Sequence, residues 1–186
     1  MAQTQISTIE IEAKDAIYKQ CSGAAIASAR VIARISQMKL APLQRRPDME
    51  HIKVLRESME SEGVRKGDAV HAYIDVADPA WENRDQSETI SLLFEMSCRT
   101  KLTGDGKVRM SVLPTNIPLR LTNGAHRLYA YCSYLVGRWS DISNVREPLE
   151  SPLTDCPWAE NLGKSPAEIL AQDDAFWVVS VEYIRR

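Results

Sequence analysis

The stretch Leu119–Tyr131 combines a strand, a glycine turn and the start of a helix, and it constrains the fold more than any other part of the chain. Its strand-like alternation ends at Gly124, and His126 and Arg127 follow in the first helical turn. The first N–H groups of a helix lack intrahelical partners, and the helix dipole adds positive potential at this end. Gly124 lets a ligand oxygen approach the backbone, and Arg127 can bind a phosphate through two parallel hydrogen bonds. The stretch therefore predicts an anion site.

Apolar alternation and helical periodicity divide the rest of the chain into strands and helices. The expected strands are Ala29–Ile35, Ala69–Val76, Lys107–Leu113, Ile117–Thr122 and Phe176–Ile184. The expected helices run from near Pro47 to Gly63, from Ala125 to Leu135 and from Ser165 to Gln172. This mixed order predicts an α+β fold, a compact domain with a small mixed sheet and helices packed on it.

Some local patterns leave the type of element open. Ile9–Gln20 is amphipathic like a short helix, but its first residues also alternate like a strand. Thr89–Cys98 is apolar enough for either a strand or a helix. Within Ala69–Val76, apolar and polar residues alternate, which predicts one buried and one polar face. Asn123 is expected to cap the helix that follows the glycine turn.

Size and composition favour a single cytoplasmic domain. The chain has 186 residues, a usual size for one domain with a proper core. Charged residues make up 26% of it and the formal net charge is −2, so no overall field favours nucleic acid. The four cysteines are far apart, which predicts reduced and mostly buried thiols. We see no signal peptide and no apolar stretch near the ~20 residues of a membrane span, so we expect no membrane partner.

The residues Gly124-Ala125-His126-Arg127 resemble the G-x-H-R signature of the ParB/sulfiredoxin-like superfamily, in which a strand–turn–helix binds nucleotide phosphate. A second block about 60 residues upstream is similar to that family's Arg-Pro and Leu-x-x-Ser pattern. It consists of Arg46, Pro47, Leu55, Ser58, Met59 and Gly63. The resemblance covers roughly residues 29–136 and 176–184. It implies a single domain over residues 1–186, with insertions near residues 78–105 and 138–164.

The resemblance also implies a nucleotide site with ATP or ADP as cofactor, with Mg²⁺ arriving on the nucleotide. The implied binding residues are Gly124, Ala125, His126, Arg127, Ser58, His51 and Arg46. Two departures weaken a sulfiredoxin-style grip on a triphosphate. His51 stands where sulfiredoxins have a lysine, and Val54 replaces a further polar contact. Ala125 replaces the cysteine nucleophile of sulfiredoxins, so we expect no repair of sulfinylated peroxiredoxin.

Three classes of function are compatible with this resemblance. Some superfamily members phosphorylate free serine, and such a kinase or nucleotide hydrolase needs a carboxylate as general base. Asp48 and Glu50 are the candidates for the base, and His126 with Arg127 would hold the transferred group. The second class is a non-catalytic accessory protein with a degenerate nucleotide site. The third is a ParB-like nucleotide switch on DNA, although the mildly acidic chain lacks a basic stripe and a helix-turn-helix segment.

In length and motif layout, the chain also resembles small proteins encoded in fungal biosynthetic clusters for pyridine-carboxylate mycotoxins such as fusaric acid. This resemblance implies a role in secondary metabolism and a small substrate derived from an amino acid. We therefore expect a nucleotide and a hydroxy amino acid, rather than nucleic acid, as the partners of this site.

Overall fold

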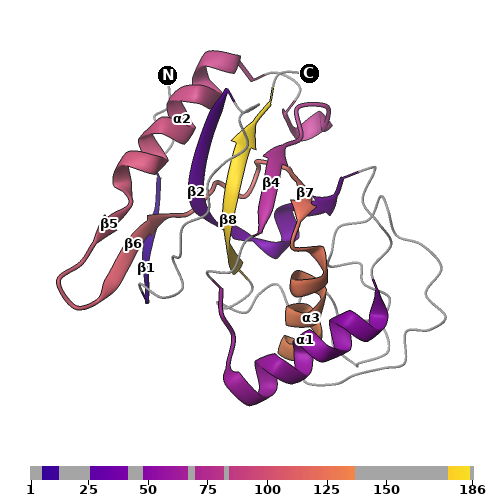
Figure 1. Ribbon diagram of the computed structural model, residues 1–186. Coiled ribbons are helices and arrows are strands. Elements are labelled where there is room, and N and C mark those ends of the chain that lie inside the picture. Colours follow the sequence, from indigo (N-terminus) through magenta and orange to yellow (C-terminus); the bar gives the residue numbers. More distant parts are fainter. Residues whose placement is uncertain are drawn as a thin grey trace.

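The protein is described by a computed structural model that covers residues 6–12, 26–41, 48–66, 70–81, 84–136 and 176–184. These residues form an α+β fold with two β-sheets and helices packed on them (Figure 1). The α+β fold class predicted from the sequence is confirmed. None of the helices in the described ranges has the length and apolar character that a membrane crossing requires.

The larger sheet has five strands in the order β2-β8-β4-β7-β3. Their bounds are β2 Ala27–Arg34, β3 Met38–Leu40, β4 His71–Ile74, β7 Leu119–Asn123 and β8 Phe176–Tyr183. The sheet is mixed, since β2–β8 and β4–β7 are antiparallel while β4–β8 and β3–β7 are parallel. The last strand in sequence therefore lies inside the sheet, where it is buried on both faces.

The smaller sheet is antiparallel and has the order β1-β6-β5. Its strands are β1 Thr8–Glu12, β5 Lys101–Leu102 and β6 Lys107–Ser111. A bridge from Ile32 of β2 to Val112 joins the two sheets, and Ile32 packs in a small apolar cluster with Val108 and Met110. The segment Thr8–Glu12, left open by its pattern, is thus a strand. The sequence patterns did not predict this second sheet.

Within the described residues, three α-helices pack on these sheets: α1 Met49–Glu62, α2 Gln86–Arg99 and α3 Ala125–Val136. Helix α1 packs on α3 at one end of the large sheet, and α2 packs on β2 (Figure 1). Two short 3-10 helices, η2 Ile35–Gln37 and η3 Pro79–Trp81, follow β2 and β4. The apolar stripe predicted for α1 is present, since Ile52 and Met59 are buried in the main core.

The predicted elements that fall on described residues agree with the structure in type, with one correction in burial. Strand β4 is shorter than the expected Ala69–Val76, and its predicted polar face is not exposed to solvent. Tyr73, in β4 between β8 and β7, is 9% exposed, and Asp75, just after the strand and paired with Arg120, is 5% exposed. The ambiguous segment Thr89–Cys98 belongs to helix α2. The expected helix Ser165–Gln172 lies outside the described residues.

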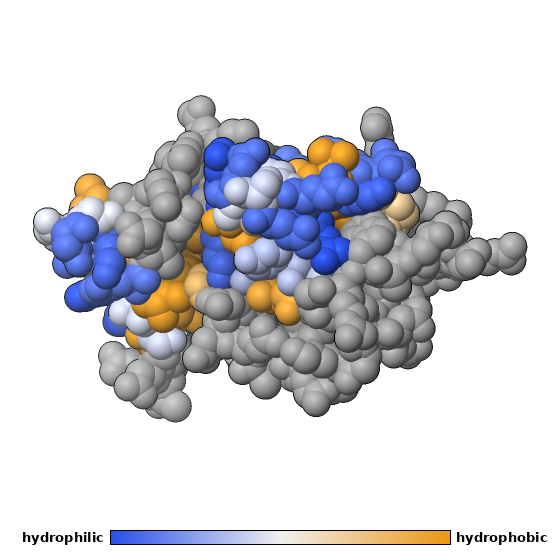
Figure 2. Space-filling view, turned by 90° about the horizontal axis from the view of Figure 1, so that it is seen from below, coloured by the Kyte–Doolittle hydropathy of each residue, from blue (hydrophilic) through white to orange (hydrophobic). Residues whose placement is uncertain are grey.

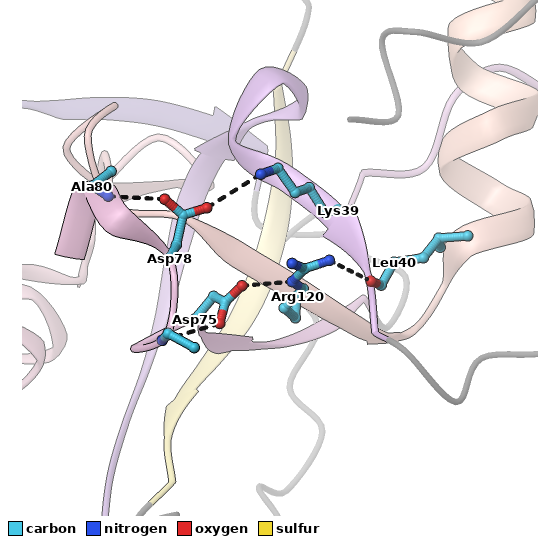
Figure 3. Close-up of polar contacts among 7 residues, drawn as sticks. Lys39, Leu40, Asp75, Asp78, Ala80 and Arg120 are labelled. Carbon is cyan, nitrogen blue, oxygen red and sulfur yellow. Dashed lines mark hydrogen bonds and ion pairs between the residues drawn. The ribbon is translucent and has the colours of Figure 1, made fainter. Parts of the chain in front are cut away.

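Two ion pairs lie on this second, polar face of the large sheet (Figure 3). The Arg120 Nε atom donates to the Asp75 carboxylate at 2.6 Å, and its Nη1 donates to the Leu40 carbonyl at 3.1 Å. Lys39 pairs with Asp78 at 3.2 Å. These contacts connect β3 and β7 to the turn after β4, and they satisfy charges that the neighbouring strands bury.

Candidate anion site at the start of helix α3

The turn between β7 and α3 has the geometry predicted for it. Gly124 has φ +93°, a conformation that favours glycine, and its carbonyl accepts the first helical hydrogen bond, from Leu128 N–H at 3.1 Å. Gly124 is therefore the N-cap residue of α3. Asn123, which the sequence suggested as the cap, is instead the last residue of β7. The N–H groups of residues 125–127 lie outside the helix's own hydrogen bonds and face the end of the strand.

A β-bulge in β7 sets the direction of this turn. Asn123 pairs with His71 of β4, whereas Leu121 pairs with Ala72, so Thr122 is one residue in excess. The Thr122 hydroxyl donates to the His71 carbonyl at 3.2 Å. A bulge bends its strand and re-aims the residues beyond it. Here it precedes the turn by one residue, and no sequence pattern indicated it.

The start of α1 lies directly against the start of α3. Asp48 is the N-cap residue of α1, and its backbone N–H donates to Nε2 of His126 at 2.9 Å. The His51 ring packs edge-on against the His126 ring, with the two centroids 5.2 Å apart and the planes at 75°. The structure thus brings together three predicted site residues, Asp48, His51 and His126, although 78 positions separate the first from the last.

The hydrogen bond from Asp48 fixes the protonation state of His126. Because Nε2 accepts a proton donor, the ring is neutral and has its own proton on Nδ1. Burial lowers the pKa of His126 below its ordinary value, and the neighbouring His51 lowers it further, while Asp48 acts in the opposite direction. At neutral pH this imidazole is a hydrogen-bond donor through Nδ1 and not a cation.

Of the two predicted carboxylates, Asp48 already has a structural task. Its Oδ1 atom accepts hydrogen bonds from Glu50 N–H at 3.1 Å and His51 N–H at 3.3 Å, which caps α1. Glu50 is exposed in the first turn of the same helix, where the dipole favours an acid. The outer surface along α1 is mainly hydrophilic (Figure 2), with charged residues such as Lys53 and Glu57 exposed.

The remaining predicted binding residues differ in how near they lie to the Gly124 turn. Arg127 is half-buried in the first turn of α3, next to His126. Ser58 is half-buried on α1, but it follows His51 by seven positions, which is about 10 Å along a helix. The structure therefore does not bring Ser58 to the pair of histidines. Arg46 lies outside the described residues.

No other reactive group of the described residues lies in this first turn. Cys132 is two turns further along α3, and complete burial raises the pKa of its thiol to about 12, so it is a core residue and not a nucleophile. Cys98 is an exposed thiol on α2, and the other two cysteines, Cys21 and Cys156, lie outside the described residues. Within the described ranges, no three His, Cys, Asp or Glu residues are grouped so that they could bind a metal ion.

Comparison with protein-family models, with curated proteins and with solved structures gave no match for this chain. The site is therefore assessed on its own geometry. A glycine-capped helix start, an adjacent arginine and two histidines lie where the N-termini of α1 and α3 meet. Such an arrangement can bind an anion by backbone N–H groups and dipoles as well as by side chains.

Proposed function

We propose that the Gly124 turn binds the phosphate of a nucleotide, as the resemblance to the ParB/sulfiredoxin-like superfamily implies. The observation that supports this most is the hydrogen bond from Asp48 N–H to His126, because it places the N-termini of two helices at one point. Both dipoles favour negative charge there. Gly124 places no side chain beside the N–H groups at the start of α3, and Arg127 adds a positive charge in the same helical turn.

We further propose phosphoryl transfer from ATP or ADP, with Mg²⁺ bound to the nucleotide, to a small hydroxy amino acid in secondary metabolism such as mycotoxin formation. Glu50 or Asp48 would take the proton of the acceptor hydroxyl while the hydroxyl oxygen attacks the terminal phosphorus of the nucleotide. The bond from that phosphorus to the bridging oxygen breaks, and the shortened nucleotide leaves. Of the two carboxylates, Glu50 is the better base, because Asp48 uses an oxygen to cap α1.

A second function, a binding protein without catalysis, is favoured by a different observation. The Asp48 carboxylate and the His126 Nε2 atom both have hydrogen-bond partners within the protein. The Nε2 atom of His126 has to release its partner before it can accept a proton from a substrate, and Asp48 has only Oδ2 left outside the helix cap. If Glu50 does not act as the base in their place, the site binds a nucleotide and performs no chemistry on it.

Two measurements in sequence test these proposals. Thermal unfolding and calorimetry of the full chain with ATP, ADP, CTP and GTP, each with and without Mg²⁺, test nucleotide binding. A ligand at 100 times its Kd stabilises a protein by about 2.7 kcal/mol, so binding is readily detected. No stabilisation by any of the four would contradict the phosphate site. Mass spectrometry of reactions with serine and homoserine then separates a kinase, which forms a phosphorylated product, from a binding protein, which forms none.

A further inference from the structure

The histidine pair makes the proposed site sensitive to protons in a specific way. Nε2 of His126 is the only ring position that can take up a proton, since Nδ1 already has one. The same Nε2 accepts the Asp48 N–H at 2.9 Å. After protonation, Nε2–H and the Asp48 N–H are both donors, so no hydrogen bond can form between them. Protonation of His126 therefore requires that its ring and the start of α1 separate.

The charged and titratable groups around His126 act on that protonation in opposite directions in the ligand-free protein. Helix α1 presents His51, whose ring is 5.2 Å away, and the carboxylates of Asp48 and Glu50 near its start. On α3, Arg127 follows directly, and His71 lies at the start of β4, opposite Asn123. Burial and His51 hold the pKa of His126 down, and Asp48 compensates only in part.

A doubly charged anion at the α3 start would reverse this balance. It would add two negative charges beside the ring, which favours the imidazolium form. It would also offer an acceptor to the Asp48 N–H that the ring releases, so the starts of both helices could donate to one ligand. The ligand thereby replaces the acceptor that Asp48 N–H loses when the His126 ring is protonated.

We propose that anion binding at the Gly124 turn is coupled to the uptake of one proton by His126, which gives up its hydrogen bond with Asp48 as the anion enters. The proton comes from the solvent and binds Nε2, and the Asp48 N–H turns to the anion. This coupling rests on the proposed phosphate site and adds its regulation by pH. It makes the site bind more tightly in acid, by up to about tenfold per pH unit for one proton.

Sulfate is a suitable probe, because its charge stays constant over the range in which histidine titrates. Calorimetry at constant ionic strength, from about pH 5 to about pH 8.5, measures its affinity for the full chain. Repeating the titrations in buffers of different ionisation enthalpy counts the protons taken up. We expect sulfate affinity to decrease as pH rises and proton uptake to approach one where the dependence is steepest.

Three variants assign the effect to one ring. His126→Gln keeps an acceptor for Asp48 N–H but cannot titrate, so its sulfate affinity should depend on pH less steeply than that of the wild type. His51→Gln removes a neighbouring imidazole, and the dependence should move to higher pH. His71→Gln is the matched control and should keep the wild-type profile. Nitrogen-15 shifts of the His126 ring in the wild type should show protonation on addition of sulfate, which tests the coupling without any substitution.

The outcomes separate the coupling from the site itself. Sulfate binding of equal strength at every pH, or a full pH dependence in His126→Gln, would overturn the coupling and leave the phosphate site standing. No sulfate binding at any pH would overturn both. An unprotonated His126 ring in the sulfate-saturated wild type at about pH 6 would also overturn the coupling.

Discussion

His126 and Arg127 are neighbours in sequence, but their surroundings give them different capacities. The His126 ring is neutral and bound to Asp48 N–H, so it contributes a single donor until it is protonated. Arg127 is a guanidinium, a planar fork of donors that matches the geometry of a phosphate. At the scale of residues, we therefore expect Arg127 to make the strongest electrostatic interaction with a bound phosphate.

We predict that Arg127→Ala weakens nucleotide binding by about 1.5–3 kcal/mol, the usual worth of hydrogen bonds to a charged group. Calorimetry with the best nucleotide of the panel measures the change. Arg65→Ala is the control, because Arg65 is an exposed arginine paired with Glu62 beyond the end of α1. Unchanged affinity in a folded Arg127→Ala protein would contradict the assignment.

Gly124 is predicted to be intolerant of any side chain. At φ +93° a Cβ atom is strained, so we expect Gly124→Ala to reduce the free energy of unfolding by about 1–2 kcal/mol and to weaken phosphate binding. Gly104→Ala is the matched control, because a Cβ there would meet no atom within 4 Å. Urea unfolding of both variants makes the comparison. Equal stabilities would show that the turn accommodates a side chain.

At the scale of elements, Asp48 determines how α1 begins. Asp48→Ala should cost about 0.5–2 kcal/mol of stability, whereas Asp48→Asn should cost little, since asparagine also caps well. Asp48→Asn therefore tests catalysis without unfolding the helix start. If a phosphoryl acceptor is found, loss of the base by Asp48→Asn or Glu50→Gln should slow turnover by about 10²–10⁴-fold. Full turnover in both variants would exclude these carboxylates as the base.

Burial should determine how much each of two ion pairs contributes to the free energy of unfolding. Arg120→Ala leaves the 5%-exposed Asp75 without its partner, and we expect a loss of about 3–5 kcal/mol in the free energy of unfolding. Arg109→Ala breaks a pair with Glu10 on the exposed side of the small sheet, where a loss of about 0–1 kcal/mol is expected. Similar losses in urea unfolding for the two variants would refute the argument from burial.

The elements that local patterns define were predictable, and those that depend on neighbours were not. The stripe of Ile52 and Met59 and the closing Gly63 were sufficient to predict α1. The burial of Tyr73 depends on the position of β4 in the sheet, which alternation does not show. Likewise, the extra residue at Thr122 exists only relative to the register of β4.

At the scale of the whole molecule, the candidate site depends on topology. The two helix starts are 78 positions apart, and the pairing of β7 with β3 and β4 brings the Gly124 turn to the end of the sheet where α1 packs on α3. No spacing in the sequence indicates this meeting, and only the family resemblance suggested it. The residue types at the turn were visible in the sequence, whereas the Asp48 to His126 hydrogen bond was not.

The lowered pKa of His126 should affect the pH dependence of global stability. The folded-state pKa of His126 is lowered from 6.5, chiefly by burial, so the unfolded chain binds more protons between these two values. The free energy of unfolding should then fall as pH falls below about 6.5, by at most about 1.4 kcal/mol per pH unit. The pKa of Asp78 is lowered from 3.8, mainly by the hydrogen bond from Ala80 N–H. Ionised Asp78 therefore stabilises the fold above about pH 3.8, and this stabilisation is lost in stronger acid.

The pH ranges in which His126 and Asp78 change stability are different, so urea unfolding at a series of pH values can assign each loss of stability to one residue. His126→Gln should remove the loss of stability that begins near pH 6.5 and leave the loss below about pH 4 unchanged. Asp78→Asn should reduce the loss below about pH 4 and leave the loss that begins near pH 6.5 unchanged, since asparagine cannot titrate and His126 is untouched. Because the two groups lie in different parts of the fold, their effects should add in the double variant. Parallel profiles for the wild type and His126→Gln above pH 4 would mean that the His126 ring is not held neutral by its surroundings.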